Sequence, residues 1–366
     1  MNTFEILYQA FRARYSLNRV QEMLDHGCTL ALIARDDEGL ETLASFLGEP
    51  NKDIDGTDPL DDVVRSTIDQ LPQEPDLLKE CDAAIVYYSD RIPEEEELRA
   101  TAELIPIQVP CLWLVDSEET IPIPEALSVP ALRSIPPRAG GPRVCRLIIG
   151  TFPELALVLA RRFSRVRKIY SRRLTNQTAA RNAAIAACSS LPVSTVPVIG
   201  IVLSLLATTG ETLVLTASQL RLCLLVAVIH GRPLDFFDRI GELWPVVGGG
   251  FGWRTAAREL AGLVPAVGWL AKASIAYSGT WAVGEGSRLF YEAGSPADHE
   301  IQRELARRSR NQAAVEARDF LANLGDRLEK DLIGPEELEE LTRLEDDEPE
   351  DAEAPVRGDS EEDEKA

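Results

Sequence analysis

The chain has few residues suited to metal binding or acid–base catalysis. Its 366 residues include three histidines and six cysteines, and no two cysteines form a Cys-x-x-Cys pair. Zinc sites need such ligands at short spacing, and histidine is the most common general acid or base. We therefore expect no metal, no cofactor and no catalytic residue. The scattered cysteines favour a reducing compartment.

Basic residues are scarce at the C-terminus. Residues 331 to 366 contain 17 acidic and three basic residues, so this segment supplies −14 of the net charge of −22. This composition is typical of disorder, and we expect an acidic disordered tail over 334–366. Net negative charge also argues against a nucleic-acid partner, because repulsion from phosphates opposes binding.

An apolar signal segment is lacking in the first residues. Residues 1–27 show an amphipathic pattern that contains Arg12, Arg14 and Arg19 without an apolar core. We expect an N-terminal helical segment that stays in the cytoplasm.

Apolar runs alternate with helical patterns over residues 28–165. The runs are short and continuous, as in strands buried on both faces, and they lie at 29–34, 83–88, 111–115 and 129–135. The helical patterns lie at 42–47, 94–104 and 147–163. Strands separated by helices form parallel sheets. The predicted fold class is α/β plus all-α, with a P-loop or Rossmann-like sheet first.

The turn after the first strand lacks the residues of a phosphate-binding loop. The pattern Gly-x-x-x-x-Gly-Lys-[Ser/Thr] uses backbone amides and lysine for phosphate and a hydroxyl for magnesium. Here the lysine position holds Leu40 and the hydroxyl position Glu41. Asp36, Asp37 and Glu38 would place negative charge beside phosphate. We predict that nucleoside triphosphates do not bind there.

Other motifs of nucleotide binding or catalysis are incomplete. Asp53-Ile54-Asp55-Gly56 spells Asp-x-x-Gly but follows no clear strand, so we interpret it as a turn. Asp116 alone matches the guanine-binding pattern Asn-Lys-x-Asp, and we interpret it as a loop cap. Gly248–Gly252 is interpreted as a connection between helices, Ser278 as a packing residue rather than a nucleophile, and His230 as a helix cap.

The middle of the chain first lacks acidic residues and then lacks charge entirely. Residues 161–181 contain eight basic residues and no acidic one, and residues 182–210 contain no charged residue. Apolar arms at 191–207 and 213–229 predict a helical hairpin, since a membrane span needs about 20 apolar residues.

The flanking charges predict how this region meets a membrane. A basic neck at 166–181 is suited to anionic lipid headgroups, and basic flanks favour cytoplasmic ends for the hairpin. Arg221, midway along the second arm, opposes insertion, because an arginine at the centre of a membrane-spanning helix raises the free energy of insertion by about 2.5 to 3.5 kcal/mol. A soluble helical bundle is therefore the alternative.

Several features of the apolar region carry a family resemblance. They are the proline-broken segment Leu191-Pro192 to Val196-Pro197, Gln219 with Leu220-Arg221-Leu222, His230-Gly231, and Leu263-Val264-Pro265-Ala266-Val267-Gly268-Trp269. In these features residues 182–294, about a third of the chain, resemble the helical domain of unknown function of YcjF-type bacterial membrane proteins, which is also appended to Era-like GTPases. The resemblance implies membrane association behind a G domain. Because the nucleotide motifs are incomplete, it implies a pseudo-GTPase.

The segment 298–333 has the pattern of an amphipathic helix. Its larger apolar residues fall near one stripe: Ile301, Leu305, Val315, Leu321, Leu324 and Leu328. Such a helix is suited to packing on the bundle or to pairing in a homo-oligomer.

These patterns predict a non-catalytic, pseudo-GTPase-like binding or scaffolding protein at the bacterial inner membrane. Its N-terminal domain would be cytoplasmic, and its partners would be anionic membrane lipids. Two alternatives stay open: a GTP or ATP hydrolase with a non-standard phosphate loop, and a soluble helical interaction module in the cytoplasm.

Overall fold

The structure is a computed structural model, and it divides into two units. Residues up to Val315 form one compact unit and residues from Glu316 the other. The described residues are 17–50, 63–73, 76–89, 92–117, 132–135, 140–188, 211–235, 239, 241–243 and 268–332. Four of the segments interpreted above therefore lie outside them: Asp53–Gly56, the arm 191–207, Gly248–Gly252 and the tail 334–366.

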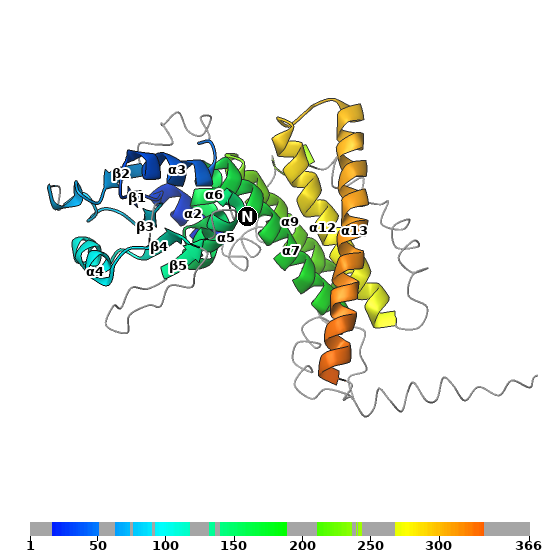
Figure 1. The fold of residues 1–366 in the computed structure, drawn as a ribbon. Helices are drawn as coiled ribbons and strands as arrows, with labels where there is room; N and C mark the ends of the chain where they lie inside the picture. Colours follow the sequence, from blue (N-terminus) through cyan, green and yellow to red (C-terminus); the bar gives the residue numbers. More distant parts are fainter. Residues whose placement is uncertain are drawn as a thin grey trace, which may run out of the picture. The chain divides into compact units, whose positions relative to one another are not determined.

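A five-stranded parallel sheet forms the α/β part, in the order β2-β1-β3-β4-β5 (Figure 1). The strands are β1 Leu30–Ala34, β2 Val63–Thr67, β3 Ala83–Tyr88, β4 Cys111–Asp116 and β5 Leu132–Ile135. The predicted parallel sheet is thus confirmed. The sequence patterns missed β2, an edge strand that contains the exposed Arg65.

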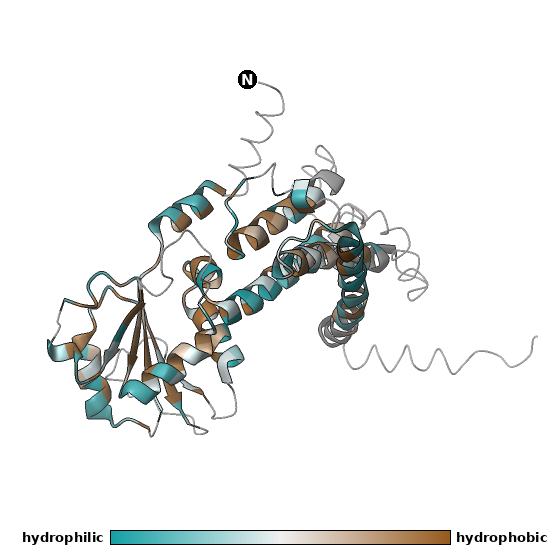
Figure 2. Ribbon diagram, turned by 90° about the horizontal axis from the view of Figure 1, so that it is seen from above, coloured by the Kyte–Doolittle hydropathy of each residue, from teal (hydrophilic) through white to brown (hydrophobic). Residues whose placement is uncertain are grey.

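Alternate strand residues enter two separate cores. Leu30 and Leu32 face one core, whereas Ala31 and Ile33 face the other. In Figure 2 most of the sheet is brown, which marks apolar residues, and lies among helices with mixed colouring. The continuous apolar runs are explained by this burial on both faces.

Helices contribute to both cores. The first core contains residues of α2 (Leu17–His26), α3 (Asp37–Leu47), α5 (Gly140–Thr151) and α6 (Ala156–Arg162). The second contains residues of the short 3₁₀ helix η1 (Leu71–Gln73) and of α4 (Glu95–Leu104). The pattern at 147–163 predicted a single helix, but α5 and α6 are separate. Pro153 lies in the break between them and has no backbone N–H to continue a helix.

Three helices pack against one another after the α/β part: α7 (Ser164–Cys188), α9 (Glu211–Ile229) and α12 (Gly268–Glu292) (Figure 1). No residue of α12 from Ala273 to Tyr291 is exposed, and Leu222 to Ile229 of α9 are all buried. A helix that is apolar on all sides is typically buried. The second half of the second arm of the predicted hairpin is therefore covered by protein. None of the helices in the described ranges is both long and apolar enough to span a membrane.

A buried polar network fixes the register of these three helices. Asn182 Nδ2 donates to Thr280 Oγ1 at 2.8 Å, and Ser218 Oγ donates to Asn182 Oδ1 at 2.7 Å. Gln219 Nε2 also donates to Thr280 Oγ1, at 3.2 Å. Because unpaired polar groups are costly in a core, this network favours one alignment of α7, α9 and α12.

The last helix, α13 (His299–Leu332), confirms the predicted helix. Ile301 and Val315 of the predicted apolar stripe are 47% and 56% exposed. The buried side chains of α13 are small or polar: Gln302, Ala306, Ser309, Ala313 and Ala317. Packing of the apolar stripe on the bundle or on another subunit stays a prediction.

Candidate functional site

The carboxyl edge of the sheet is where a fold of this kind would bind a ligand. In the strand order β2-β1-β3-β4-β5 the connections reverse direction between β1 and β3. Doubly wound sheets bind ligands beside such a switch point, outside the carboxyl ends of the strands. Arg35 and Asp36 follow β1, and Ser89 follows β3. These residues and the first turn of α3 form the candidate site.

The first turn of α3 is capped by the chain's own carboxylate. Asp36 Oδ1 accepts a hydrogen bond from the backbone N–H of Gly39 at 2.7 Å, and Asp37 and Glu38 occupy the first helical turn. A helix N-terminus binds phosphate through free amides and a positive dipole. Here a side chain already accepts from one amide, and three acids oppose a second anion.

The residues at the lysine and hydroxyl positions of the phosphate-loop pattern serve the fold. Leu40 is buried in the first core. Glu41 Oε1 pairs with Arg65 Nη1 of β2 at 3.2 Å. Neither side chain replaces the missing lysine or hydroxyl.

The cation that follows β1 is also engaged. Arg35 Nη2 lies 2.9 Å from Glu97 Oε1 in the first turn of α4, and both side chains are about three-quarters buried, with 27% and 23% exposed. This ion pair links the end of β1 to α4. A phosphate at this edge would have to compete with Glu97 for Arg35.

The end of β4 lacks the geometry of a guanine site. Trp113 and Leu114 stand at the positions of asparagine and lysine in the guanine-binding pattern, and they are buried in the second and first core. Burial raises the pKa of Asp116, although a hydrogen bond from the Tyr87 hydroxyl partly offsets this. Burial and the Asp116 charge raise the pKa of Tyr87 to about 12. Asp116 alone cannot select a base, and its interpretation as a loop cap stays a prediction.

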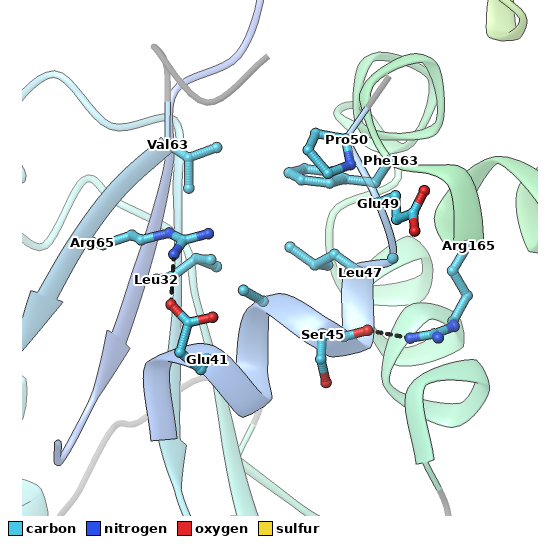
Figure 3. A pocket seen from close by; sticks show the side chains of 12 residues that line it. Leu32, Glu41, Ser45, Leu47, Glu49, Pro50, Val63, Arg65, Phe163 and Arg165 are labelled. Carbon is cyan, nitrogen blue, oxygen red and sulfur yellow. Dashed lines mark hydrogen bonds and ion pairs between the residues drawn. The ribbon is translucent and has the colours of Figure 1, made fainter. Parts of the chain in front are cut away.

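A pocket of about 360 Å³ lies away from this edge, between α3, β2 and the start of α7 (Figure 3). Its apolar wall includes Leu47, Val63 and Phe163. Its charged rim is internally satisfied: Arg65 pairs with Glu41, and Arg165 Nη1 donates to the carbonyl of Ser45. The pocket therefore offers an apolar hollow without a paired catalytic acid and base. Sequence patterns could not locate it because β2 was missed.

His230 lies at the end of α9, and its side chain is largely but not fully buried. Its Nδ1 lies 2.8 Å from the carbonyl of Val226, to which it donates, and its ring stacks on Tyr291 with centroids 5.8 Å apart. Burial lowers its pKa to about 4, with help from the charges of Arg167 and Arg288. This placement confirms the predicted helix-end position beside Gly231, which has a positive φ of 81°.

The other candidate chemical groups are structural. Ser278 is buried and donates to the carbonyl of Ile275 at 3.2 Å, which confirms a packing role. Burial raises the pKa of Cys81 to about 11 and that of Cys111 and Cys145 to about 12, so these thiols are unreactive. Among the described residues, no group of three metal-ligating side chains comes together.

The basic segment comprises the end of α6 and the start of α7, and two sets of its cations can be distinguished. One set donates to backbone carbonyls: Arg162 Nη1 to Cys28 at 2.8 Å, Arg165 to Ser45, and Arg167 Nη2 to Arg161 at 3.3 Å. The other set is exposed on α7: Lys168, Arg173 and Arg181. The exposed cations are placed to meet a partner. The sequence could not separate the two sets, because both are arginine-rich.

Comparisons with protein-family models, with curated proteins and with solved structures found no match to this chain.

Proposed function

We propose that this protein is a non-catalytic binding or scaffolding protein whose α/β part keeps a nucleotide-binding architecture without binding nucleotide. The observation that carries the proposal is the occupied N-terminus of α3, where Asp36 accepts from the Gly39 amide at 2.7 Å. The burial of Leu40 and the Arg35–Glu97 pair support it further. Together these contacts engage Arg35 and one backbone amide of the first turn of α3, two groups that a triphosphate would otherwise use beside β1.

We also propose that the protein acts at the bacterial inner membrane from the cytoplasmic side. Support comes from the exposed cations of α7 and from the absence of charge in residues 182–210 that follow them. Cations beside an apolar segment are attracted to anionic headgroups, each contributing about 1 kcal/mol near the surface.

Calorimetry tests the nucleotide part of the proposal. GTP and ATP, each with magnesium, should give no binding heat when titrated into the full chain. Micromolar affinity for either nucleotide would overturn the proposal and favour a hydrolase with non-standard residues. Asp36→Ala, which removes the capping carboxylate, tests whether the cap alone prevents binding; we expect no binding there either, because Leu40 and Glu41 remain.

A soluble helical interaction module is the second candidate function. The covered surface of α12 and of the second half of α9 favours it, because both helices already bury their apolar side chains in protein. Cell fractionation followed by alkaline carbonate extraction separates the two candidates. Recovery of the whole protein in the soluble fraction before extraction would overturn membrane association.

A further inference from the structure

Positive charge extends beyond the basic neck into α5. Residues 140–188, which comprise α5, α6 and α7, contain ten basic residues and a single acidic residue, Glu154. Glu154 Oε2 already pairs with Arg19 Nη2 at 2.7 Å. This part of the chain thus has a net charge of +9, although the whole chain has −22.

The structure brings the start of α5 alongside the start of α7. These two helices pack on each other. The side chain of Arg165 passes so close to Gly141 that a Cβ atom there would lie 2.9 Å from Arg165 Cδ. Arg143 follows Gly141 by two residues in α5, and Lys168 follows Arg165 by three residues in α7, so both cations lie within a turn of the place where the two helices approach each other.

Each of these helices has one buried side and one exposed side. On α5, Val144 and Ile148 are buried, whereas Arg143 and Arg146 are exposed. On the first half of α7, Val166 and Leu174 are buried. Lys168 and Arg173 are exposed.

We propose that these exposed side chains form one cationic surface that binds anionic lipid headgroups, the α5/α7 surface. Its members are Arg143, Arg146, Lys168 and Arg173. The inference rests on the proposed membrane association and changes which residues contact the lipid. Arg162, Arg165 and Arg167 are excluded because they donate to backbone carbonyls, and two arginines of α5 are added.

A membrane fits this surface better than a nucleic acid does. In the sequence, the α7 cations are followed by residues 182–210, which have no charge, so cations and an uncharged segment are neighbours along the chain. Lipid offers both an anionic surface and an apolar interior, whereas a nucleic acid offers the apolar segment nothing.

The test is vesicle binding by the full chain, with paired charge-neutralising variants. Vesicles of phosphatidylcholine with about 30% phosphatidylglycerol present the anionic surface, and pure phosphatidylcholine vesicles are the neutral comparison. Arg143→Gln with Arg146→Gln removes the α5 cations, and Lys168→Gln with Arg173→Gln removes two α7 cations. Each cation is worth about five-fold in binding, so each pair should weaken binding about 25-fold.

The matched control removes the same charge elsewhere. Arg303 and Arg308 are exposed on α13, and their double replacement by Gln should change vesicle binding less than about two-fold. All variants are exposed substitutions, so thermal melting should match the wild type. Equal losses in the control would overturn the α5/α7 surface, because binding would then depend on total charge alone.

The outcomes separate failure of this inference from failure of the proposed function. If the wild type binds vesicles but both α5/α7 variants bind equally well, the surface is wrong and membrane association stands. If the wild type binds neither vesicle and is soluble in cells, the proposed function itself fails. Tight binding to a short DNA duplex that both variants abolish, without vesicle binding, would assign the surface to nucleic acid and overturn the inference.

Discussion

The buried imidazole of His230 should make folding stability depend on pH between about pH 6.5 and pH 4. Burial lowers the pKa of His230 from 6.5 to about 4, and the cations Arg167 and Arg288 act in the same direction. The unfolded chain therefore binds a proton in this window while the folded chain does not. Since the unfolded state gains that proton, stability falls as the pH falls through the window.

The size of the effect follows from the two pKa values. A difference of about 2.5 units corresponds to a total of about 3 kcal/mol, all of it lost by the lower end of the window. At about pH 5 the unfolded form is largely protonated and the folded form is not, so about 2 kcal/mol is already lost relative to about pH 7.5. This loss is a large fraction of the stability of an ordinary domain.

Urea unfolding at about pH 7.5 and about pH 5 measures this loss. Carboxylates also titrate in that range, so the informative quantity is the difference between wild type and His230→Asn. Asparagine keeps a donor for the Val226 carbonyl but does not titrate. The wild type should lose about 2 kcal/mol more than the variant between the two pH values.

A matched replacement tests whether burial is the cause. His26→Asn removes a histidine whose side chain is 79% exposed, and it should leave the pH dependence unchanged. Equal pH dependence in wild type and His230→Asn would refute the argument, because the buried ring would then contribute nothing in this window.

Three further substitutions and one control test the packing and capping described above by urea unfolding at neutral pH. Asn182→Ala should cost about 1 to 3 kcal/mol, because the hydroxyl of Ser218 loses its buried acceptor. Gly284→Ala should cost a similar amount, since its new Cβ would lie 2.6 Å from Thr175 Cγ2, whereas Gly150→Ala, with open space around it, should be neutral or stabilising. Asp36→Ala should cost about 0.5 to 2 kcal/mol as the α3 cap is lost, and no loss there would contradict the capping geometry.

The strands that sequence patterns predicted are those buried on both faces. β3 is a continuous apolar run because its residues alternate between two cores, and β1 and β4 follow the same rule. The edge strand β2 was missed because Arg65 is exposed and only Ser66 is buried in it. A strand that is mostly only partly buried produces no continuous apolar run, so the pocket beside it was missed as well.

The sequence predicts that this part of the chain is helical, but it does not predict which helices contact each other or through which residues. Hydropathy alone predicts α9, because its buried half is apolar on all sides. Asn182 and Thr280 lie 98 residues apart, and nothing in their local sequences indicates that they bond. For α13, residue size pointed to Ile301 and Val315, whereas the structure buries Ala306 and Ala313. Local patterns report how apolar a helix is, but the neighbouring helix decides which side is covered.

The cations of the basic segment show why charge counts give an incomplete account of a binding surface. Arg162 of α6 and Arg165 of α7 donate to the backbone carbonyls of Cys28 and Ser45, which lie far away in the sequence, so the fold uses these two cations to hold the end of α6 and the start of α7 in place. A guanidinium that bonds a carbonyl must break that bond to reach a lipid phosphate, whereas the exposed Lys168 can reach it directly. The free energy available for lipid binding therefore depends on whether a cation is already bonded within the fold. By this criterion the proposed lipid-binding residues include Arg143 and Arg146 of α5 as well as residues of the neck.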